Sequence, residues 1–287
     1  MKIAVMADIH SNHIALERCI EEAEKIGAEE YLFLGDYIGE LAYPERTISV
    51  LDQLEGRYPC TFIRGNKEDY WIDHRNGKHT DWNWETGTSG SGILQYAYAH
   101  LTGEQIEKFD SMPIAKKMQY PDMPPFVICH GSPFKVNESL REDFDHIDSL
   151  TKRLETEMTI CAHFHVQSQY IRNGKRVINP GAVGLPLKSG GKAQFMMLYD
   201  HDGTWSTEFH SLSYDVEKAI HEMDEEDLSG QAPAWYRVTK AVLHGENISQ
   251  AIVLAKALEF CKRDEGDADW RCIPEKYWDM ALNEFGI

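Results

Sequence analysis

The first twelve residues, Met1–Asn12, read MKIAVMADIHSN and set a pattern that the rest of the chain repeats. The apolar run Ile3–Met6 is short and ends at once in polar residues, which is typical of a buried strand in a parallel sheet. Asp8 and His10 follow two residues apart, so on an extended backbone their side chains point to the same side. Taken alone, the pair fits a capped strand end as well as one half of a metal site.

Short apolar runs followed by polar turns and helical spacing recur along the chain. We predict strands at residues 31–34, 60–63, 126–129 and 158–162, and helices at residues 14–26, 44–54, 93–101 and 104–112. The first three repeats of strand, polar turn and helix argue for a parallel sheet. The pairs Asn173-Gly174 and Asp202-Gly203, each between two apolar runs, predict two β-hairpins.

Side chains that can bind metal follow the predicted strands, each just after an apolar run. They are Asp8, His10, Asp36, Asn66, His130, His163 and His165. The carboxyl ends of strands in an open α/β sheet share one edge, so residues far apart in sequence converge there. Each residue alone could be a turn former or a structural histidine. Seven of them at the same kind of position predict a metal centre.

In this order the residues resemble the calcineurin-like metallophosphoesterase superfamily. The blocks are D-x-H (Asp8, His10), G-D-x-x-G (Gly35 to Gly39), G-N-x-E (Gly65 to Glu68), H-G (His130, Gly131) and H-x-H (His163, His165). The continuation Asn179-Pro180-Gly181 is similar to the compact bacterial phosphodiesterase branch. The resemblance covers about residues 1–210 and implies an α/β fold, a four-layer α/β/β/α sandwich. We place a domain boundary near Ser213, giving a metallophosphoesterase-like domain at 1–213 and a helical C-terminal extension at 214–287.

The same resemblance implies two divalent metal ions. Asp8, His10, Asp36 and His165 would hold one ion. Asp36, Asn66, His130 and His163 would hold the other, with Asp36 bridging. These oxygen and nitrogen donors favour manganese, with iron, zinc, cobalt or nickel as alternatives. Four positive charges against two aspartates and a bridging hydroxide leave a centre that attracts phosphate, and the metal-bound hydroxide would be the nucleophile.

The third block departs from the family's common form, G-N-H-[DE], in which the histidine acts as a general acid or stabilises charge on phosphate. Here that position is Lys67, followed by Glu68. A lysine near its ordinary pKa of about 10.4 is a poor proton donor at neutral pH, but its charge can hold a phosphate oxygen. We therefore predict that Lys67 binds substrate. Phosphodiesters and phosphoanhydrides should be favoured over alkyl phosphomonoesters such as phosphoserine.

Several neighbouring residues have two interpretations. Asn12 follows the first block closely enough to bind substrate, and it fits the N-cap of the helix at 14–26 equally well. Arg64 could reach a phosphate or point outward. His13, His74 or His79 could supply the missing proton, but nothing places them in the site and we interpret them as surface histidines. The sequence assigns no general acid.

Two regions lie outside the repeated pattern. Residues 67–88 show no clean period and carry Trp71, Trp82 and Trp84. These rings could stack a nucleobase in a binding loop, or pack a loop against the surface. From about Asp215 the chain becomes acidic and helical, with helices predicted at 216–223, 248–261 and 275–285. This extension could cap the substrate, form a dimer surface or cover one face.

Composition limits the classes of partner. The formal net charge is −18, from 29 Lys and Arg against 47 Asp and Glu, which disfavours nucleic-acid polymers and anionic membranes. No apolar run approaches the roughly 20 residues of a membrane span and no signal segment is visible, so we expect a cytoplasmic protein. The six cysteines form no C-x-x-C pair and are expected to be buried, reduced thiols. A homo-oligomer is compatible with the sequence.

The sequence thus predicts a binuclear metal-dependent phosphoesterase. The expected substrates are small phosphodiesters or phosphoanhydrides, including nucleotides such as dinucleoside polyphosphates. One alternative is a protein serine/threonine phosphatase, which the lysine at position 67 disfavours. Another is a non-catalytic regulatory protein on the same fold, which the complete set of seven metal-competent residues disfavours.

Overall fold

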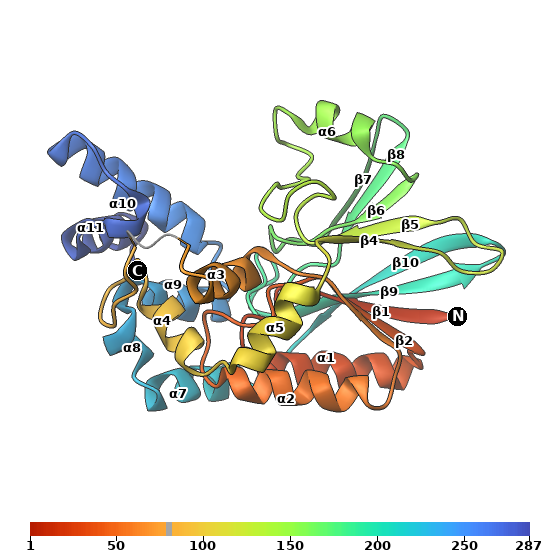
Figure 1. Ribbon diagram of the computed structural model, residues 1–287, viewed down its shortest axis with the longest axis horizontal. Coiled ribbons are helices and arrows are strands. Elements are labelled where there is room, and N and C mark those ends of the chain that lie inside the picture. The colour runs from red at the N-terminus through yellow and green to blue at the C-terminus, as the bar shows by residue number, and fades with distance from the viewer. Residues whose placement is uncertain (79–81) are drawn as a thin grey trace.

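The computed structural model describes residues 1–78 and 82–287, and at its centre two mixed β-sheets pack face to face (Figure 1). The first sheet has the order β10-β9-β1-β2-β3 and the second the order β4-β5-β6-β8-β7. The first contains β1 (Lys2–Met6), β2 (Glu30–Phe33), β3 (Cys60–Phe62), β9 (Ala193–His201) and β10 (Thr204–Leu212). The second contains β4 (Ala115–Met118), β5 (Phe126–Cys129), β6 (Met158–Ile160), β7 (Ser168–Arg172) and β8 (Lys175–Asn179).

The direction of the strands follows the repeated pattern. The strands β1, β2 and β3 run parallel, as the three sequence repeats predict, and β5, β6 and β8 form a second parallel set. The two predicted hairpins are β7-β8 and β9-β10, and they add antiparallel strands at the sheet edges. All parallel strands therefore direct the residues that follow them toward the same side of the molecule.

Burial of the first sheet on both faces explains its uninterrupted apolar runs. In β1, Ile3 and Val5 face the second sheet, where they pack with Phe126 and Ile160. The alternate residues Ala4 and Met6 face the helices. That outer layer contains α1 (His13–Ile26), α2 (Pro44–Glu55), α3 (Asn66–Arg75), α4 (Gly92–Ala99) and α5 (Gly103–Ser111).

The outer face of the second sheet is covered by α6 (Ile147–Arg153) and the loop before it, through Leu140, Ile147 and Leu150. Figure 1 shows α6 on one side of the paired sheets and α1 with α2 on the other. The predicted four-layer α/β/β/α sandwich is confirmed.

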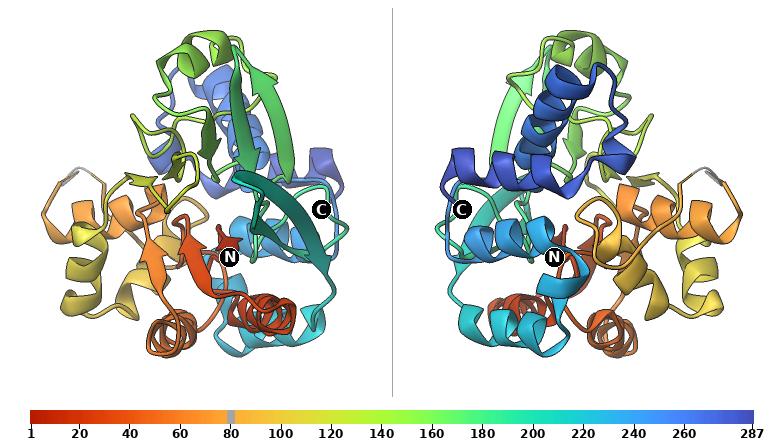
Figure 2. Two further views of the ribbon diagram at one scale, coloured as in Figure 1. Left: turned by 90° about the vertical axis from the view of Figure 1, so that its right-hand side faces the viewer. Right: turned by 90° about the vertical axis from the view of Figure 1, so that its left-hand side faces the viewer.

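The C-terminal segment is helical, as predicted, and lies beyond the strand ends (Figures 1 and 2). It contains α7 (Val216–Glu225), α8 (Leu228–Gln231), α9 (Pro233–Leu243), α10 (Gln250–Glu265), a 3₁₀ turn (Trp270–Cys272) and α11 (Glu275–Phe285). Its apolar core includes Leu41, Ile93 and Leu185 from the preceding part of the chain. A domain boundary near Ser213 stays a prediction.

Two sequence expectations need correction. Residues 67–75 belong to α3, although the segment shows no helical period, because its buried side includes Glu68 beside Trp71 and Ile72. The edge strand β4 and the helices α8 and α9 were not anticipated. The two lysines of β4 are exposed, so this strand lacks an apolar signal.

No helix among the described residues combines the length and apolarity needed to cross a bilayer.

Candidate metal centre

The seven residues singled out from the sequence all lie where strands of the two sheets end. Asp8 and His10 follow β1, Asp36 follows β2, and Asn66 begins α3 just after β3. His130 follows β5, and His163 and His165 follow β6. The structure brings all seven side chains together, in two overlapping groups.

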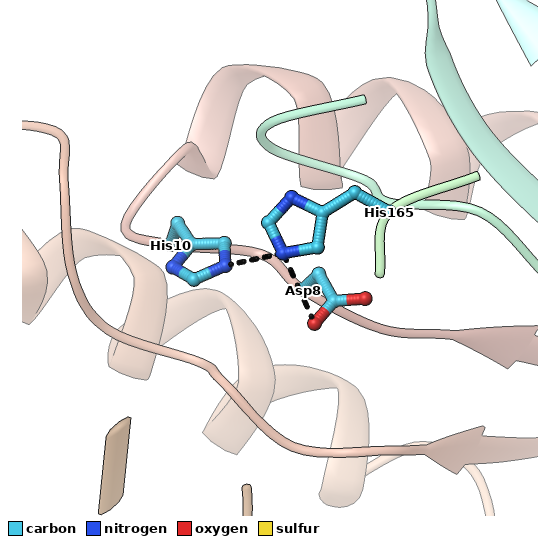
Figure 3. Close-up of side chains that lie close together, drawn as sticks. All are labelled: Asp8, His10 and His165. Atoms are coloured by element: carbon cyan, nitrogen blue, oxygen red, sulfur yellow. Dashed lines mark hydrogen bonds and ion pairs between the residues drawn. The ribbon is translucent and has the colours of Figure 1, made fainter. Parts of the chain in front are cut away.

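The first group consists of Asp8, His10 and His165 (Figure 3), whose ligand atoms all lie within 4.8 Å of one another. Nε2 of His10 lies 3.2 Å from Nε2 of His165. Oδ1 of Asp8 lies 3.5 Å from Nε2 of His165. Oδ2 of Asp36 is 3.8 Å from Nε2 of His10, which places the fourth predicted member next to the group.

The second group is centred on His130, which with Asp8 and Asp36 forms another set within 4.8 Å. Nε2 of His130 lies 3.5 Å from Oδ1 of Asp36 and 3.0 Å from Oδ1 of Asn66. The His163 ring lies edge-on to that of His130, with centroids 5.2 Å apart. Asp36 thus contacts members of both groups.

Three imidazoles are oriented by acceptors outside the centre. Nδ1 of His130 donates to the carbonyl oxygen of Leu34 at 2.7 Å, and Nδ1 of His165 donates to that of Leu185 at 2.8 Å. Nδ1 of His10 lies 2.6 Å from Oε2 of Glu40. In each ring the opposite nitrogen, Nε2, points into the centre, which is the usual arrangement for a histidine that binds metal.

The atoms that meet in the centre are mostly nitrogen and oxygen atoms with lone pairs, which a positive charge stabilises. When both rings are neutral and carry the proton on Nδ1, Nε2 of His10 and Nε2 of His165 present lone pairs to each other at 3.2 Å. Oδ1 of Asp8 is fully buried and has no hydrogen-bond partner among the described residues. Such a set is stabilised by a cation at its centre. The residues present therefore fit a divalent metal.

The local electrostatics agree with this. Burial raises the pKa of Asp8 to about 7, and it lowers the pKa of His163 to about 4 and of His165 to about 3. These histidines are neutral at pH 7, the form that binds metal. Burial alone would lower the pKa of His130, but Asp36 and Asp8 raise it to about 10. The carboxylates thus stabilise positive charge beside this imidazole, whether from a proton or from a metal ion.

The backbone of the centre is strained. Five of the seven residues, Asp8, His10, Asp36, His163 and His165, have positive φ angles between 51° and 75°. Only a few per cent of non-glycine residues adopt this left-handed conformation, and it is maintained when the surroundings enforce it. Here the loops hold one another, since both Ile9 and His10 donate their backbone N–H groups to the carbonyl oxygen of Asp36.

Glu68 fastens the second and third blocks together. Its buried carboxylate accepts hydrogen bonds from the backbone N–H groups of Asp36, Tyr37 and Gly65, all at 2.8–2.9 Å. Gly65 passes so close to Asp36 that a Cβ atom there would overlap with Oδ1. The glycine and the glutamate of the G-N-x-E block therefore act on the geometry of Asp36.

The sequence analysis missed Glu40, which is 4% exposed and contacts both His10 and Lys67. Lys67 itself lies at the centre: its backbone N–H donates to Oδ1 of Asp36 at 2.8 Å, and its side chain pairs with Glu40. The signal for Glu40 was its position one residue after the G-D-x-x-G block. A carboxylate so near a metal-binding turn is a natural partner for a ligand histidine.

The residues with two interpretations fall mostly outside the centre. Asn12 caps α1 by accepting from the N–H of Ala15, and its amide donates to Gly184 and Tyr214, so the helix-cap interpretation describes its contacts. Arg64 pairs with Asp69 and Asp110.

Of the three histidines considered as proton donors, His13 is not at the surface. It is buried, and its Nε2 lies 2.8 Å from Oε2 of Glu222. His74 stacks on Trp84 with centroids 3.9 Å apart. His79 lies outside the described residues. Trp71 and Trp82 are buried and belong to the core of the first sheet, which corresponds to the packing interpretation of this segment.

A cavity of about 670 Å³ opens beside the centre. One wall contains His10, Asp36, Asn66, Lys67, His163 and His165. The C-terminal segment supplies Trp235, Leu254 and Trp270, and the loop after β5 supplies Lys135, Arg141 and His146. His146 is exposed and lines the cavity, and it was not anticipated from the sequence.

Comparison with known proteins gives consistent matches. The chain is 24% identical over 250 residues to an uncharacterized protein of Methanocaldococcus jannaschii, MJ0912, covering 81% of this chain and 94% of that protein. Its fold is similar to the crystal structure of the hypothetical protein PH1004 from Pyrococcus horikoshii OT3, with a TM-score of 0.71 and 21% identity over 86% of this chain and 99% of that one.

It is also similar to a metallophosphoesterase from Sphaerobacter thermophilus, with a TM-score of 0.65 and 20% identity over 84% of this chain and 100% of that one. Residues 1–203 match the calcineurin-like phosphoesterase superfamily domain. With the blocks at the strand ends, the two packed sheets and the buried cluster of histidines and aspartates, the chain belongs to the calcineurin-like phosphoesterase superfamily.

Proposed function

We propose that this protein is a binuclear metal-dependent phosphoesterase that hydrolyses small phosphodiesters or phosphoanhydrides. The observation that carries the proposal is the convergence of three outward-anchored imidazoles and two buried aspartates on one point beside a cavity. Asp8, His10, Asp36 and His165 would hold one ion. Asp36, Asn66, His130 and His163 would hold the other. When bound, the ions supply Lewis acidity toward phosphoryl oxygens and activate water as the nucleophile.

Manganese is the metal that we favour, because the centre offers only imidazole, carboxylate and amide donors. No thiolate is among them: the described cysteines are free, and none belongs to either group of ligand atoms. Donors of this type also bind iron, zinc, cobalt and nickel, so the availability of each metal can determine which one is bound.

Lys67 is the residue of this chain that we assign to the substrate. Its ammonium group lies at the cavity wall and is held by Glu40. Burial alone would lower the pKa of Lys67, but the carboxylate of Glu40 outweighs it and raises the pKa. The side chain therefore stays charged at neutral pH and can hold a phosphate oxygen without giving up a proton. Leaving groups that need no protonation should depart most easily.

The cavity agrees with a substrate larger than inorganic phosphate. A volume of about 670 Å³ lies within the usual range for sites that bind cofactors and nucleotides. Its lining includes the apolar side chains of Trp235, Leu254 and Trp270 as well as the charged residues of the centre. A phosphate linked to a planar apolar group, as in a nucleotide, matches both kinds of lining, so dinucleoside polyphosphates are among the proposed substrates.

The test compares three substrates with manganese-loaded protein. Bis-p-nitrophenyl phosphate and p-nitrophenyl phosphate share one leaving group and differ as diester and monoester, and diadenosine tetraphosphate represents the anhydrides. We expect the diester and the anhydride to have the higher kcat/KM, and the activity to disappear after chelation and return with Mn²⁺.

The Asp36→Asn variant is the control for the metal centre. Activity that is equal in wild type and variant would contradict the proposal. Faster turnover of the monoester would favour the phosphatase alternative. If the protein binds metal but hydrolyses none of the three substrates, the result would favour the alternative of a non-catalytic regulatory protein.

A further inference from the structure

Glu40 lies between three parts of the molecule that are remote in sequence. Its Oε2 atom is 2.6 Å from Nδ1 of His10. Its Oε1 atom accepts from Nζ of Lys67 and, at 3.2 Å, from Nε1 of Trp235 on α9. One carboxylate therefore contacts a histidine of the metal centre, the cation assigned to substrate and the C-terminal helices.

We propose that Glu40 is a positioning residue that orients His10 and Lys67 together, and that Trp235 ties this carboxylate to the C-terminal helices. The inference rests on the proposed function, because it assigns His10 to the metal and Lys67 to the phosphate. It adds a link between the cavity wall and the reacting centre.

Burial makes these contacts obligatory. The side chains of Glu40 and His10 are each 3% exposed, and that of Lys67 is 12% exposed. A carboxylate removed from water is stable only when its oxygens are paired. Oε2 of Glu40 is paired through its ion-pair contact with His10, and Oε1 accepts hydrogen bonds from Lys67 and Trp235, so the position of the carboxylate and the positions of its partners depend on one another.

The contact with His10 fixes the direction of the ring. With Nδ1 held by Glu40, Nε2 points toward Asp36 and His165. Gly39 leaves room for this contact, since a Cβ atom there would lie 2.8 Å from the same nitrogen, Nδ1. A histidine oriented in this way needs no reorganisation when it binds metal.

The contact with Trp235 reaches the cavity wall. The indole lines the cavity and packs edge-on against Trp278 of α11, with centroids 5.6 Å apart. Its N–H group is the donor to Glu40. The C-terminal segment therefore contacts the machinery of the centre directly, in addition to shaping the space beside it.

The experiment uses two constants measured on the full chain. The first is the dissociation constant of Mn²⁺ from metal-depleted protein, by titration calorimetry. The second is the dissociation constant of inorganic phosphate from the manganese-loaded protein. The variants are Glu40→Gln, Lys67→Met and Trp235→Phe, the last of which keeps an aromatic ring against Trp278 and removes the five-membered ring that carries the N–H group.

Glu222→Gln is the matched control. Glu222 is also a buried carboxylate shared by a histidine and a cation, with His13 at 2.8 Å and Arg46 at 2.7 Å. It does not line the cavity. We expect both constants of this variant to stay within about twofold of wild type, because its partners contact neither metal nor substrate.

Glutamine at position 40 cannot serve both sides, because its amide has one acceptor oxygen where the carboxylate has two. We expect Glu40→Gln to weaken Mn²⁺ binding roughly 10- to 100-fold, as loss of a histidine's outer partner does, and to weaken phosphate binding as well. Lys67→Met should weaken phosphate binding more than Mn²⁺ binding, because it removes the cation assigned to phosphate and one of the three partners of Glu40. Trp235→Phe should weaken both constants by about fivefold or less but by more than twofold, because it removes one hydrogen bond to the carboxylate and leaves the two charged partners in place.

Trp235→Phe separates positioning from charge, because it leaves the carboxylate in place. It also keeps the test decisive if Glu40→Gln does not fold. The proposal is overturned if Trp235→Phe leaves both constants within twofold of wild type, or if folded Glu40→Gln leaves either one unchanged. If wild-type protein binds no Mn²⁺, both this inference and the proposed function fail. If wild-type protein binds Mn²⁺ and the Glu40→Gln variant binds it equally well, only this inference fails.

Discussion

The loops at the strand ends and the helices after Asp215 border the same cavity, but they are built in different ways. The loops are polar, left-handed at five metal-competent residues and held by hydrogen bonds between backbones. The helices pack through apolar side chains such as Val238, Val242 and Trp278. The comparison indicates that the chemistry of the centre and the shape of the cavity are carried by separate regions, which meet at Glu40 and Trp235. Four predictions test this division.

The largest effect is expected in the loops. Asp36→Asn should reduce kcat/KM for the diester on the order of 10³-fold, because the shared carboxylate would no longer hold the ions that contribute several kcal/mol to the transition state. Steady-state kinetics with excess Mn²⁺ and metal analysis of the dialysed protein measure the effect. Full metal content with normal kinetics would show that Asp36 does not bridge.

Metal removal should act on stability through the same loops. At a free Mn²⁺ concentration 100 times the dissociation constant, binding adds about 2.7 kcal/mol to the free energy of unfolding. Treatment with a chelator should remove this contribution, and calorimetric melting with and without Mn²⁺ measures it. A Tm that does not respond to Mn²⁺ would mean that the left-handed loops are stable without a cation.

A smaller effect, on stability alone, is expected in the C-terminal region. Glu222→Gln removes the charged partner of His13 and Arg46, which should cost about 2 kcal/mol of unfolding free energy. Chemical denaturation measures the change. The division predicts unchanged kcat and KM, and a loss of activity in folded protein would show that the two regions are not separable.

The smallest effect concerns the shape of the cavity. Leu254→Ala removes apolar surface from the wall, at about 0.8 kcal/mol for each methylene that contacts substrate. KM for an aromatic diester should rise by roughly fivefold, an effect of about 1 kcal/mol, while KM for dimethyl phosphate should not change. An equal rise in KM for both substrates would indicate that Leu254 supports the geometry of the metal centre.

The sequence was most informative where structure is local. Asp8, Asp36 and His130 each follow a short apolar strand, and the rule that parallel strands end at one edge was enough to bring them together. It was less informative where a residue's task is tertiary. The helix α3 was hidden because Glu68, on its buried side, accepts three backbone N–H groups and breaks the apolar period.

Other features depend on partners that no local pattern indicates. The contact between Glu40 and Trp235 joins residues 195 positions apart. The choice between cap and substrate contact at Asn12 was open because both fit an asparagine before a helix, and it depended on where Gly184 and Tyr214 lie. The tryptophans that line the cavity, Trp235 and Trp270, come from the C-terminal segment and not from the aromatic-rich stretch that drew attention in the sequence.

The acceptors that aim the three imidazoles differ in one respect that bears on how such a centre can change over generations. His130 and His165 are aimed by backbone carbonyl groups of Leu34 and Leu185, which are present whatever side chain occupies those positions. His10 is aimed by a side chain, which a single codon change can shorten, neutralise or remove. The Glu40 side of the centre is therefore the adjustable side, where a lineage or a protein engineer can alter metal affinity in small steps while the other two histidines stay in place.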